Sequence, residues 1–374
     1  MSAGLRILHV LRAPVGGLFR HVTDLAAAQT ARGHAVGLVL DSTTGGAQAE
    51  SALQGLAPVA KLGIHRVAMP RHPGFSDLNA IRFVAARARE ANADVLHGHG
   101  AKGGAYARLA ESAAIRVYTP HGGSMHYSAA SPLGLVYLTL ERFLARRTDL
   151  FLFESKYGLA TFREKIETPR ALARVVHNGV RSDELSAIMP DPDAADVVFV
   201  GELRRLKGVD VLIESLARLL AEEKIESAIL FGDGPDTARY RAEVERRGLT
   251  QHIHFGGVLP ARAAFRRGRV LAVPSRAESL PYIVLEAAAA SVPIAATRVG
   301  GLPEIFGPDA RDLVPPNDSA AFAQAIMAVL EGCAASRTKR LHERIARDFR
   351  VEAMTESVLA AYREALAVRQ ARHG

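Results

Sequence analysis

The chain of 374 residues contains no tryptophan and only one cysteine, Cys333. A single cysteine excludes internal disulfide bonds and is typical of a protein that folds in a reducing compartment. No apolar run is long enough for a spanning helix, and the run from Leu5 to Leu11 is too short for a signal peptide. We therefore expect a cytoplasmic protein.

Aromatic residues are also scarce, at 6%, whereas 47 lysines and arginines exceed 39 aspartates and glutamates. The basic residues are scattered along the chain, which argues against a nucleic-acid-binding protein. A net charge of +8 still favours acidic partners. Phosphorylated substrates and an anionic membrane surface, at the inner face of the cell membrane, are the partners to expect.

The length and the 48% hydrophobic content allow two domains with substantial cores. Strand and helix patterns alternate from residue 5 onward, and the alternation restarts after a polar, proline-containing and acidic segment, residues 181–196. We therefore predict an α/β protein with a Rossmann-like domain at 1–182, a linker at 183–192 and a second Rossmann-like domain at 193–350.

The first predicted strand is followed by the glycine turn APVGG and a helix, at the sheet edge where ligands bind in such folds. Asp41 ends the second strand where a ribose-binding acid would stand in a dinucleotide fold. The turn nevertheless lacks the pattern GxGxxG, which argues against a nicotinamide cofactor.

The stretch from Val273 to Glu304 carries two carboxylates, Glu278 and Glu286, in the segment ESLPYIVLE. Ser279 is a candidate N-cap and Pro281 suits a first helical turn, so the helix should begin just after Glu278 and run to about Ala290.

Backbone N–H groups of Leu280, Tyr282 and Ile283 would then face a phosphate at the positive end of the helix dipole. With a carboxylate on each side, the segment suits a nucleotide diphosphate sugar. One carboxylate would hold hydroxyls of one sugar, and the other carboxylate those of the second.

This segment resembles the ExxxxxxxE signature of the retaining, family 4 type glycosyltransferases (glycosyl transferases group 1). Further motifs occur in the order typical of that family: GG at 16–17, TPHG at 119–122, HNGV at 177–180, VGELRRLKG at 200–208, FGDGP at 231–235 and TRVGGLPEIFG at 297–307. The resemblance covers almost the whole chain. It implies the GT-B fold, in which two Rossmann-like domains face a cleft and a C-terminal helix, here 351–374, crosses back to the first domain.

The resemblance also implies roles for individual residues. Glu278 would position the donor sugar, Glu286 would bind ribose, and His121 would line the cleft near the transferred sugar. Lys207 and Arg204 would neutralise the diphosphate. Other donor contacts would come from Gly16, Gly17, Arg205, Val258, Leu280, Pro281 and Tyr282.

The chain departs from the family pattern at three places. Glu202 stands where many members have arginine, so Arg204 or Arg205 would have to supply that cation, and we favour Arg204. Ser279 and Ser291 replace common glycines. The second serine would strain a left-handed helix cap by about 1 kcal/mol.

His97 and His99 lie on one face of a predicted strand, but no nearby cysteine or HExxH supports zinc. We expect no metal site and no cofactor. Lys102 is a candidate acceptor contact, and a solvated lysine is an equal alternative.

Residues 133–147 predict an amphipathic helix with Arg142, Arg146 and Arg147 near its polar edge. This pattern is typical of a membrane-surface helix and equally of a helix packed on a sheet. We favour core packing, because the strand DLFLFES follows directly.

The sequence thus predicts a hexosyltransferase type enzyme (EC 2.4) that moves a sugar, with retention, from a nucleotide diphosphate sugar to a glycan or lipid-linked acceptor. The expected setting is cell-envelope or exopolysaccharide biosynthesis. A nucleotide-sugar epimerase or hydrolase and a noncatalytic sugar-nucleotide-binding scaffold stay open as alternatives. Nucleic acid is not an expected partner.

Overall fold

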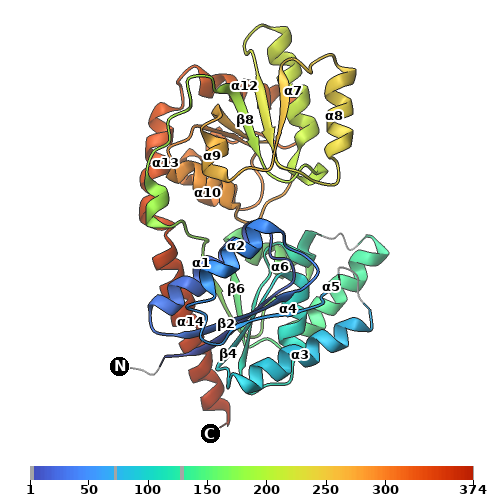
Figure 1. Ribbon diagram of the computed structural model, residues 1–374, viewed down its shortest axis with the longest axis vertical. Helices are drawn as coiled ribbons and strands as arrows, with labels where there is room; N and C mark the ends of the chain where they lie inside the picture. The colour runs from blue at the N-terminus through green and yellow to red at the C-terminus, as the bar shows by residue number, and fades with distance from the viewer. Residues whose placement is uncertain (1–3, 71–73, 127–129, 374) are drawn as a thin grey trace. The chain divides into compact units, whose positions relative to one another are not determined.

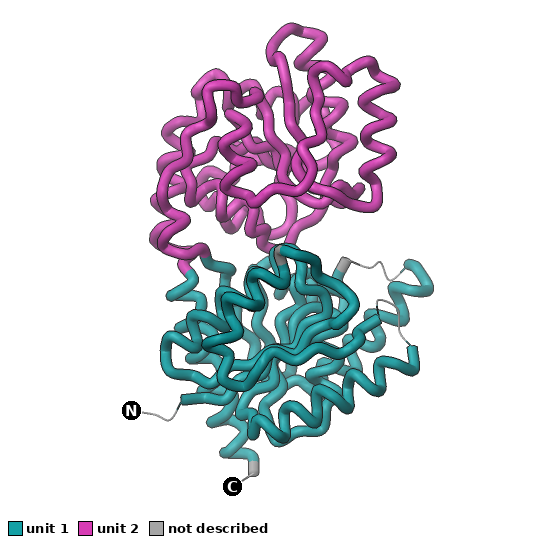
Figure 2. Tube along the Cα trace, viewed as in Figure 1, with its two compact units in different colours: residues 1–179, 351–374 teal, residues 180–350 magenta. Residues whose placement is uncertain are grey.

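The computed structural model describes residues 4–70, 74–126 and 130–373. It divides into two compact units (Figure 2): unit 1 comprises residues 1–179 and 351–374, and unit 2 comprises residues 180–350. Each unit contains one parallel β-sheet with helices packed on it. The predicted α/β class is confirmed.

Unit 1 is built on a seven-stranded sheet with the order β3-β2-β1-β4-β5-β6-β7. The strands are β1 (Arg6–Leu11), β2 (Ala35–Asp41), β3 (Ile64–Val67), β4 (Val95–His99), β5 (Ile115–Thr119), β6 (Leu150–Phe153) and β7 (Leu172–Val175). Its helices are α1 (Gly16–Ala31), α2 (Ala47–Leu56), α3 (Ser76–Glu90), α4 (Gly100–Leu109), α5 (Pro132–Ala145), α6 (Lys156–Lys165), α14 (Val351–His373) and the short 3₁₀ helix η1 (Gly123–His126).

The central strands of unit 1 are buried on both faces, which explains their continuous apolar runs. Alternate residues of β1 enter different cores: Ile7 packs with residues of α1 and α14, and Leu8 and Val10 pack with α3 and α4. The strand order reverses between β1 and β4, so the carboxyl ends of these strands form the edge where α/β sheets bind ligands.

The C-terminal helix α14 belongs to unit 1, although the whole of unit 2 precedes it in the chain. It runs beside α1, and the red and blue helices are adjacent in Figure 1. Val358 and Tyr362 are buried against the sheet. This confirms the prediction that the last helix returns to the first domain.

Unit 2 has a five-stranded sheet with the order β10-β9-β8-β11-β12. The strands are β8 (Ala195–Val200), β9 (Ala228–Phe231), β10 (Ile253–Gly257), β11 (Gly268–Val273) and β12 (Ile294–Ala296). The helices are η2 (Ser182–Leu185), η3 (Arg205–Lys207), α7 (Val209–Ala221), α8 (Thr237–Arg246), α9 (Ala261–Phe265), α10 (Tyr282–Ala289), α11 (Leu302–Phe306), η4 (Gly307–Asp312), α12 (Ser319–Leu330) and α13 (Ala335–Asp348).

Helix α10 begins later than the sequence predicts. Pro281 occupies the N-cap position, and no side chain caps the helix. The Ser279 hydroxyl is buried without a hydrogen-bond partner among the described residues, while its carbonyl accepts the N–H of Gly301 at 2.8 Å. Ser279 is therefore committed to the loop that packs against Gly301, and its prediction as N-cap is wrong.

The C-terminal end of α10 is a Schellman motif. The N–H of Val292 donates to Ala287 O at 2.8 Å, and the N–H of Ser291 donates to Ala288 O at 3.1 Å. Ser291 has the positive φ of 57° that this motif requires. The predicted left-handed cap is thus confirmed, at a cost of about 1 kcal/mol relative to glycine.

The predicted linker at 183–192 packs on unit 2. The N–H of Ile188 donates to Ala290 O, and the N–H of Asp191 donates to Arg266 O. Glu184 is buried, and its carboxylate accepts the N–H of Arg181 at 2.8 Å. The segment therefore belongs to unit 2, whose first residue is Val180.

Helix α5 packs on the core of unit 1, in line with the preference stated from the sequence, but it also carries a second apolar face. Gly134, Leu138, Glu141 and Ala145 face the interior, but the opposite side of the helix is exposed to solvent and apolar. Its exposed residues are Leu133, Leu135, Val136, Leu140 and Phe143, with 40% to 62% of their surface accessible. Leu138, Leu144 and the charged Glu141 thus pack inward, while the five large apolar residues just named point outward.

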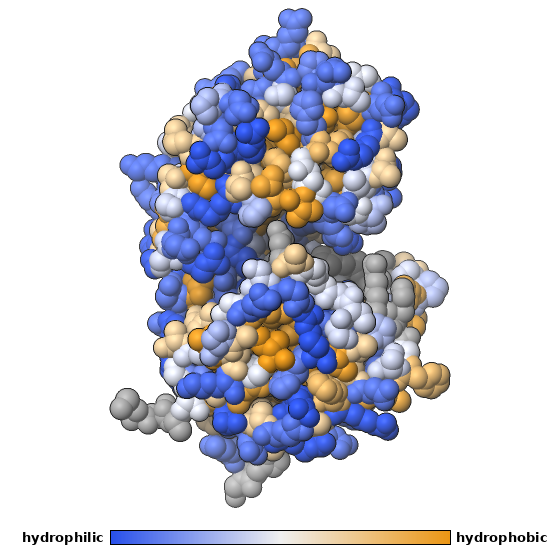
Figure 3. Space-filling view, in the orientation of Figure 1, coloured by the Kyte–Doolittle hydropathy of each residue, from blue (hydrophilic) through white to orange (hydrophobic). Residues whose placement is uncertain are grey.

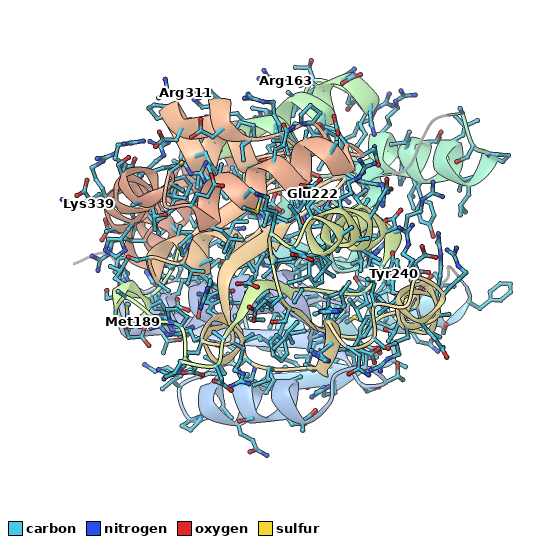
Figure 4. The ribbon with its side chains drawn as sticks, turned by 90° about the horizontal axis from the view of Figure 1, so that it is seen from above. Arg163, Met189, Glu222, Tyr240, Arg311 and Lys339 are labelled. Atoms are coloured by element: carbon cyan, nitrogen blue, oxygen red, sulfur yellow. The ribbon has the colours of Figure 1, made fainter. Side chains whose placement is uncertain are left out.

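The surface elsewhere fits the scattered charge of the sequence. The face in Figure 3 is mainly hydrophilic, with hydrophobic side chains in separate groups. Arg163, Arg311 and Lys339, labelled in Figure 4, project from three different helices, α6, η4 and α13. Among the described helices none alone has the length and apolar character to cross a membrane; α12 and α13 qualify only as a pair bent by 91°.

Candidate functional site

In unit 2 the structure brings Lys207 and Glu278 together. Lys207 Nζ lies 2.7 Å from Glu278 Oε1, although 71 residues separate the two along the chain. Lys207 ends η3, and the next residue, Gly208, has φ +70°. A Cβ on Gly208 would lie 2.0 Å from Pro274 O, so glycine lets the lysine turn approach the loop that carries Glu278.

Glu278 is held rigidly in that loop. Its side chain is only 9% exposed, and Oε1 also accepts a hydrogen bond from Ser275 Oγ at 2.7 Å. Gly300 packs so closely that a Cβ there would lie 1.7 Å from Glu278 O. Both bonds fall on the same carboxylate oxygen, so Oε2 is left as the oxygen that can accept from a ligand hydroxyl.

Arg276 braces the lysine turn, a role that the sequence reasoning missed. It forms a bidentate ion pair with Asp210, with both N–O distances at 2.7 Å, and donates to Arg205 O and to Asn317. Burial raises the pKa of Asp210, but the hydrogen bonds and charge of Arg276 outweigh it, so the pKa lies below its usual value. Arginine ranks among the commonest residues of this chain, so its spacing gave no signal.

The N-terminus of α10 lies at the edge of the same loop. Leu280, Pro281 and Tyr282 are buried, and Glu286 is half-buried one turn into the helix. The N-cap residue makes no side-chain cap bond, and the positive end of a helix dipole favours an anion. The predicted spacing of loop carboxylate, helix end and helix carboxylate is therefore present.

The other residues predicted in unit 2 are exposed. Arg204 makes an ion pair with Glu202 at 3.3 Å, and the N–H of Arg205 donates to Asp236 at 2.8 Å. Val258 follows β10 and is 62% exposed. Among the described residues no hydrogen bond or ion pair joins these three side chains to the Lys207–Glu278 pair, so the choice between the two arginines stays a prediction.

In unit 1, Gly16 and Gly17 open helix α1 directly after the turn that follows β1. Both are exposed, Gly16 has φ +66°, and nothing lies within 4 Å of a Cβ placed on it. The helix end has no side-chain cap. This geometry leaves room for a phosphate at the N–H groups, as predicted for these glycines.

His121 follows β5 at the carboxyl edge of the sheet, with φ +50°. Its two ring nitrogens have partners within the unit: Nε2 lies 3.1 Å from His99 Nδ1, and Nδ1 lies 3.1 Å from Glu154 Oε1. The ring is 7% exposed. His121 is therefore held in a fixed orientation by neighbours that the sequence analysis had not connected to it.

Those neighbours belong to a group of buried histidines at the same edge. The rings of His21 and His99 contact His121, and those of His9 and His97 contact His99, with the ring centres of His97 and His99 3.9 Å apart. Burial lowers the pKa of His9 to about 4 and holds the pKa values of His21, His97 and His99 well below their usual value. These four rings are neutral at physiological pH.

Two sets of three within this group have nitrogen atoms within 4.8 Å of one another: His9, His97 and His99, and His21, His99 and His121. Neutral imidazole nitrogens are suitable metal ligands. They are already engaged in short hydrogen bonds, however, including those from His97 to Tyr362 and Thr119 at 2.6 and 2.8 Å. The expected absence of a metal stays a prediction.

Lys102, a candidate acceptor contact from the sequence, pairs with Asp77 at 2.7 Å. Burial alone would raise the pKa of Asp77. The hydrogen bonds from Lys102, Tyr106 and the Gly74 N–H, with the charge of Lys102, together outweigh it and hold that pKa below its usual value. The lysine is therefore not a simply solvated side chain, the alternative considered from the sequence.

Two parallel sheets with the strand orders described above, and a final helix that returns to the first unit, define the GT-B fold. Solved glycosyltransferases share it. Sucrose-phosphate synthase from Thermosynechococcus elongatus superposes with a TM-score of 0.78 at 20% identity, covering 97% of this chain and 100% of that one. A glycosyltransferase from Rickettsia africae gives 0.76 at 18% identity, covering 97% and 99%.

The sequence comparisons identify the family. Residues 15–184 match the family described as Glycosyltransferase Family 4, and residues 194–332 match Glycosyl transferases group 1. Both domains of such an enzyme are thus recognised in order, and the chain belongs to the group 1 glycosyltransferases of the GT-B fold. The resemblance stated from the motifs is confirmed.

Two curated relatives are each 30% identical. One is a teichuronic acid biosynthesis glycosyltransferase of Bacillus subtilis (strain 168), matched over 64% of this chain and 61% of its own length. The other is a D-inositol 3-phosphate glycosyltransferase of Actinosynnema mirum, matched over 50% and 48%. The chain therefore spans between about half and three fifths of the length of these relatives.

Proposed function

We propose that the protein transfers a sugar, with retention at the anomeric carbon, from a nucleotide diphosphate sugar to a glycan or lipid-linked acceptor. The observation that carries the proposal is the contact between Lys207 Nζ and Glu278 Oε1 beside the uncapped end of α10. It joins a cation, a hydroxyl-binding carboxylate and an anion-binding helix end in one unit.

Each group then has a step to perform. Lys207 and the helix end stabilise the negative charge that develops on the leaving diphosphate, without a metal ion. Glu278 Oε2 accepts hydroxyls of the donor sugar, and Glu286 holds the ribose. Retention without a covalent nucleophile implies attack from the face of the leaving group, whose phosphate oxygen takes the proton of the acceptor hydroxyl.

A role in cell-envelope or exopolysaccharide biosynthesis is part of the proposal. It is supported by the name of the Bacillus subtilis relative, which refers to teichuronic acid biosynthesis, and by the similarity of the fold to WaaG, a glycosyltransferase involved in lipopolysaccharide biosynthesis. That structure superposes with a TM-score of 0.70 at 17% identity, so the likeness shows a shared fold.

A thermal-shift panel tests the donor site. At 100 times its dissociation constant, the matching nucleotide among UDP, GDP and ADP should stabilise the protein by about 2.7 kcal/mol. Glu286→Ala should weaken that shift at the same concentration, because the ribose loses its acceptor. Glu245→Ala, an exposed glutamate on α8, is the matched control and should keep it.

If none of the nucleotides raises the melting temperature, the donor site assigned to unit 2 is wrong. If a donor binds, product analysis decides between the candidate activities. Transfer to an acceptor supports the proposal, whereas epimerised or free sugar as the sole product supports the alternative enzymes. Binding without turnover would support a scaffold.

We further propose that the acceptor is met at an anionic membrane surface, through the outer face of α5. Val136 and Phe143 are 62% and 50% exposed on that face, and Arg146 and Arg147 are exposed at its C-terminal end. The guanidinium of Arg147 lies 5.0 Å from the centre of the Phe143 ring. Apolar side chains bordered by arginines suit an interfacial helix on phosphate headgroups.

Vesicle sedimentation tests this proposal. The protein should sediment with phosphatidylglycerol vesicles and stay in the supernatant with phosphatidylcholine vesicles. Salt should weaken the binding. The double variant Val136→Glu/Phe143→Glu should lose binding by at least about tenfold, because each apolar side chain contributes about 1.5–3 kcal/mol when buried. Met189→Glu, at a residue that is 76% exposed but lies in unit 2, should bind like the wild type, and equal loss in both variants would contradict the assignment.

A further inference from the structure

Unit 2 contains a pocket that the proposed sugar transfer does not use. It lies between α7 and α8, which are adjacent in Figure 1, and its volume is about 280 Å³. Side chains of these two helices line it, together with Arg276 and Asn317. Lys207, Glu278 and Glu286 are not among its lining residues, so the pocket is a site of its own.

A buried hydroxyl without a partner is the first sign of a ligand. Tyr240 lies on α8 and is labelled in Figure 4; it is 1% exposed and packs in the core of unit 2. Its hydroxyl forms no hydrogen bond among the described residues, yet the residue lines the pocket. Burial and then the charge of Asp210 raise the pKa of Tyr240 to about 12, so the hydroxyl lies near the Asp210 side of the pocket. A ligand that reaches it would satisfy a polar group that is otherwise costly to bury.

The charges at the pocket leave a positive surplus. Each of its three carboxylates already pairs with arginine: Asp210 with Arg276, Glu214 with Arg218, and Glu243 with both Arg246 and Arg247. Arg239 also lines the pocket but forms no ion pair within the described part of the chain, and its guanidinium lies 6.0 Å from the centre of the Tyr240 ring. These five arginines and three carboxylates together favour an anionic ligand.

The remaining hydrogen-bonding atoms indicate what the anion carries. Asn317 accepts from Arg276 with Oδ1, so its NH₂ can donate to a ligand. The oxygens of Asp210 accept from Arg276 and keep further lone pairs for hydroxyl groups. Ligand pockets range from about 300 to 1,000 Å³, and this one is at the small end. A phosphate attached to a single sugar ring fits these donors, acceptors and this volume.

We infer that the pocket between α7 and α8 binds a small phosphorylated metabolite of the hexose phosphate class. Arg239 and Arg247 hold the phosphate, and the Tyr240 hydroxyl and the Asp210 carboxylate meet the hydroxyls of the sugar. The ligand is an effector rather than a substrate, because the residues assigned to sugar transfer lie outside the pocket.

Arg276 links this pocket to the lysine turn. Its side chain pairs with Asp210 and donates to Arg205 O, and its backbone N–H donates to Leu206 O at 2.9 Å. Arg205 and Leu206 belong to η3, which ends at Lys207. A ligand beside Asp210 and Arg276 therefore acts on the hydrogen bonds that hold the lysine. The consequence, which rests on the proposed function, is that the effector and the nucleotide alter each other's affinity by about fivefold or more.

Isothermal titration calorimetry tests the binding site without any substrate. The ligands are glucose 1-phosphate, glucose 6-phosphate and mannose 6-phosphate, with inorganic phosphate and free glucose as the reference ligands. At least one hexose phosphate should bind about tenfold or more tightly than inorganic phosphate, because the sugar adds hydrogen bonds to the phosphate contacts. If none binds more tightly than inorganic phosphate, the inference is wrong.

Arg239→Gln locates the ligand. It should weaken hexose phosphate binding by about tenfold or more, because it removes a charged donor. Arg241→Gln is the matched control, since Arg241 is on the same helix but lies 4.8 Å from the centre of the Phe255 ring and does not line the pocket. Glu286→Ala should also bind like the wild type. Loss of binding in Glu286→Ala with full binding in Arg239→Gln would place the ligand in the donor site and overturn the inference.

Tyr240→Phe separates a ligand-binding role from a structural one. The free variant should melt at the same temperature as the wild type or higher, because it lacks a buried hydroxyl that has no partner. Its affinity for the hexose phosphate should nevertheless fall. A variant that is less stable than the wild type and binds equally well would show that the hydroxyl serves the fold alone, which contradicts the inference.

Nucleotide titrations with and without saturating hexose phosphate test the coupling. The nucleotide affinity of the wild type should change by about fivefold or more, and the hexose phosphate affinity should change by the same factor when the nucleotide is present. Arg239→Gln should show no change at the same effector concentration. Independent binding of the two ligands would contradict the coupling through Arg276. If hexose phosphate binds but no nucleotide does, the proposed function fails and the effector site stands.

Discussion

Replacing Lys207 with alanine is expected to lower kcat by about a hundred- to thousandfold, the usual effect of removing one preorganised group that stabilises developing charge. The ammonium lies 2.7 Å from Glu278 Oε1, and η3 and Gly208 hold the turn that carries it. The loss should fall on kcat as well as on donor binding, because the charge on the diphosphate grows as the glycosidic bond breaks.

Lys224→Ala is the matched control, since Lys224 is an exposed lysine of the same unit far along the chain from both signature residues. Its kcat should equal that of the wild type. Steady-state rates with the donor found in the thermal-shift panel give the measurement. A Lys207→Ala variant that keeps kcat within threefold would show that the lysine serves only to pair with Glu278.

Removal of Lys207 also leaves Glu278 without its cation in a site where the carboxylate is 9% exposed. Ser275 Oγ would remain as a hydrogen-bond donor to Oε1. We therefore expect a loss of stability of about 1–3 kcal/mol, the cost of a buried charged group that loses a partner. The activity assay must be run below the melting temperature of the variant, so that this loss is not mistaken for a catalytic effect.

The sequence was sufficient for those features that depend on short stretches of chain. The βα alternation, the lysine turn and the two carboxylates of the α10 segment were all predicted, because each is a local pattern. The positive φ of Ser291 was predicted for the same reason. The return of α14 to unit 1 was predicted only through the family resemblance, since no local pattern tells a helix which domain it packs against.

The group of buried histidines around His121 could not be found in this way. His9, His99, His121 and Glu154 are separated by up to 145 positions, and only the strand order brings them together. A usable signal did exist, since each of these residues lies on or just after a predicted strand, and parallel strands present their carboxyl ends at one edge. The pair at 97 and 99 was instead tested only against metal motifs, which depend on spacing.

The outer apolar face of helix α5 could not be predicted for a different reason. Both of its faces carry apolar residues, so the hydrophobic pattern alone cannot tell which side is buried. The deciding residue is Glu141, whose buried carboxylate accepts from Arg108 Nη1 at 2.9 Å and from the Tyr118 hydroxyl at 3.1 Å. A buried glutamate thus marks the inner face of this helix.

This buried pair leads to the largest expected effect on stability. Glu141→Ala should lower the free energy of unfolding by about 3–5 kcal/mol, because Arg108, which is fully buried over the Tyr118 ring, would lose its countercharge. Urea denaturation gives the measurement. Glu214→Ala breaks the exposed pair with Arg218 and should cost no more than about 1 kcal/mol.

The triple variant Arg108→Met/Tyr118→Phe/Glu141→Leu separates the charge effect from loss of packing. It removes both charges and the hydroxyl while keeping side-chain volume, so it should recover most of the stability lost in Glu141→Ala. Failure to recover would mean that the ion pair itself, rather than the unpaired arginine, determines stability. Because α5 is held to the sheet through Glu141, the triple variant should also keep its outer face in place and still bind phosphatidylglycerol vesicles, whereas Glu141→Ala should bind them less well.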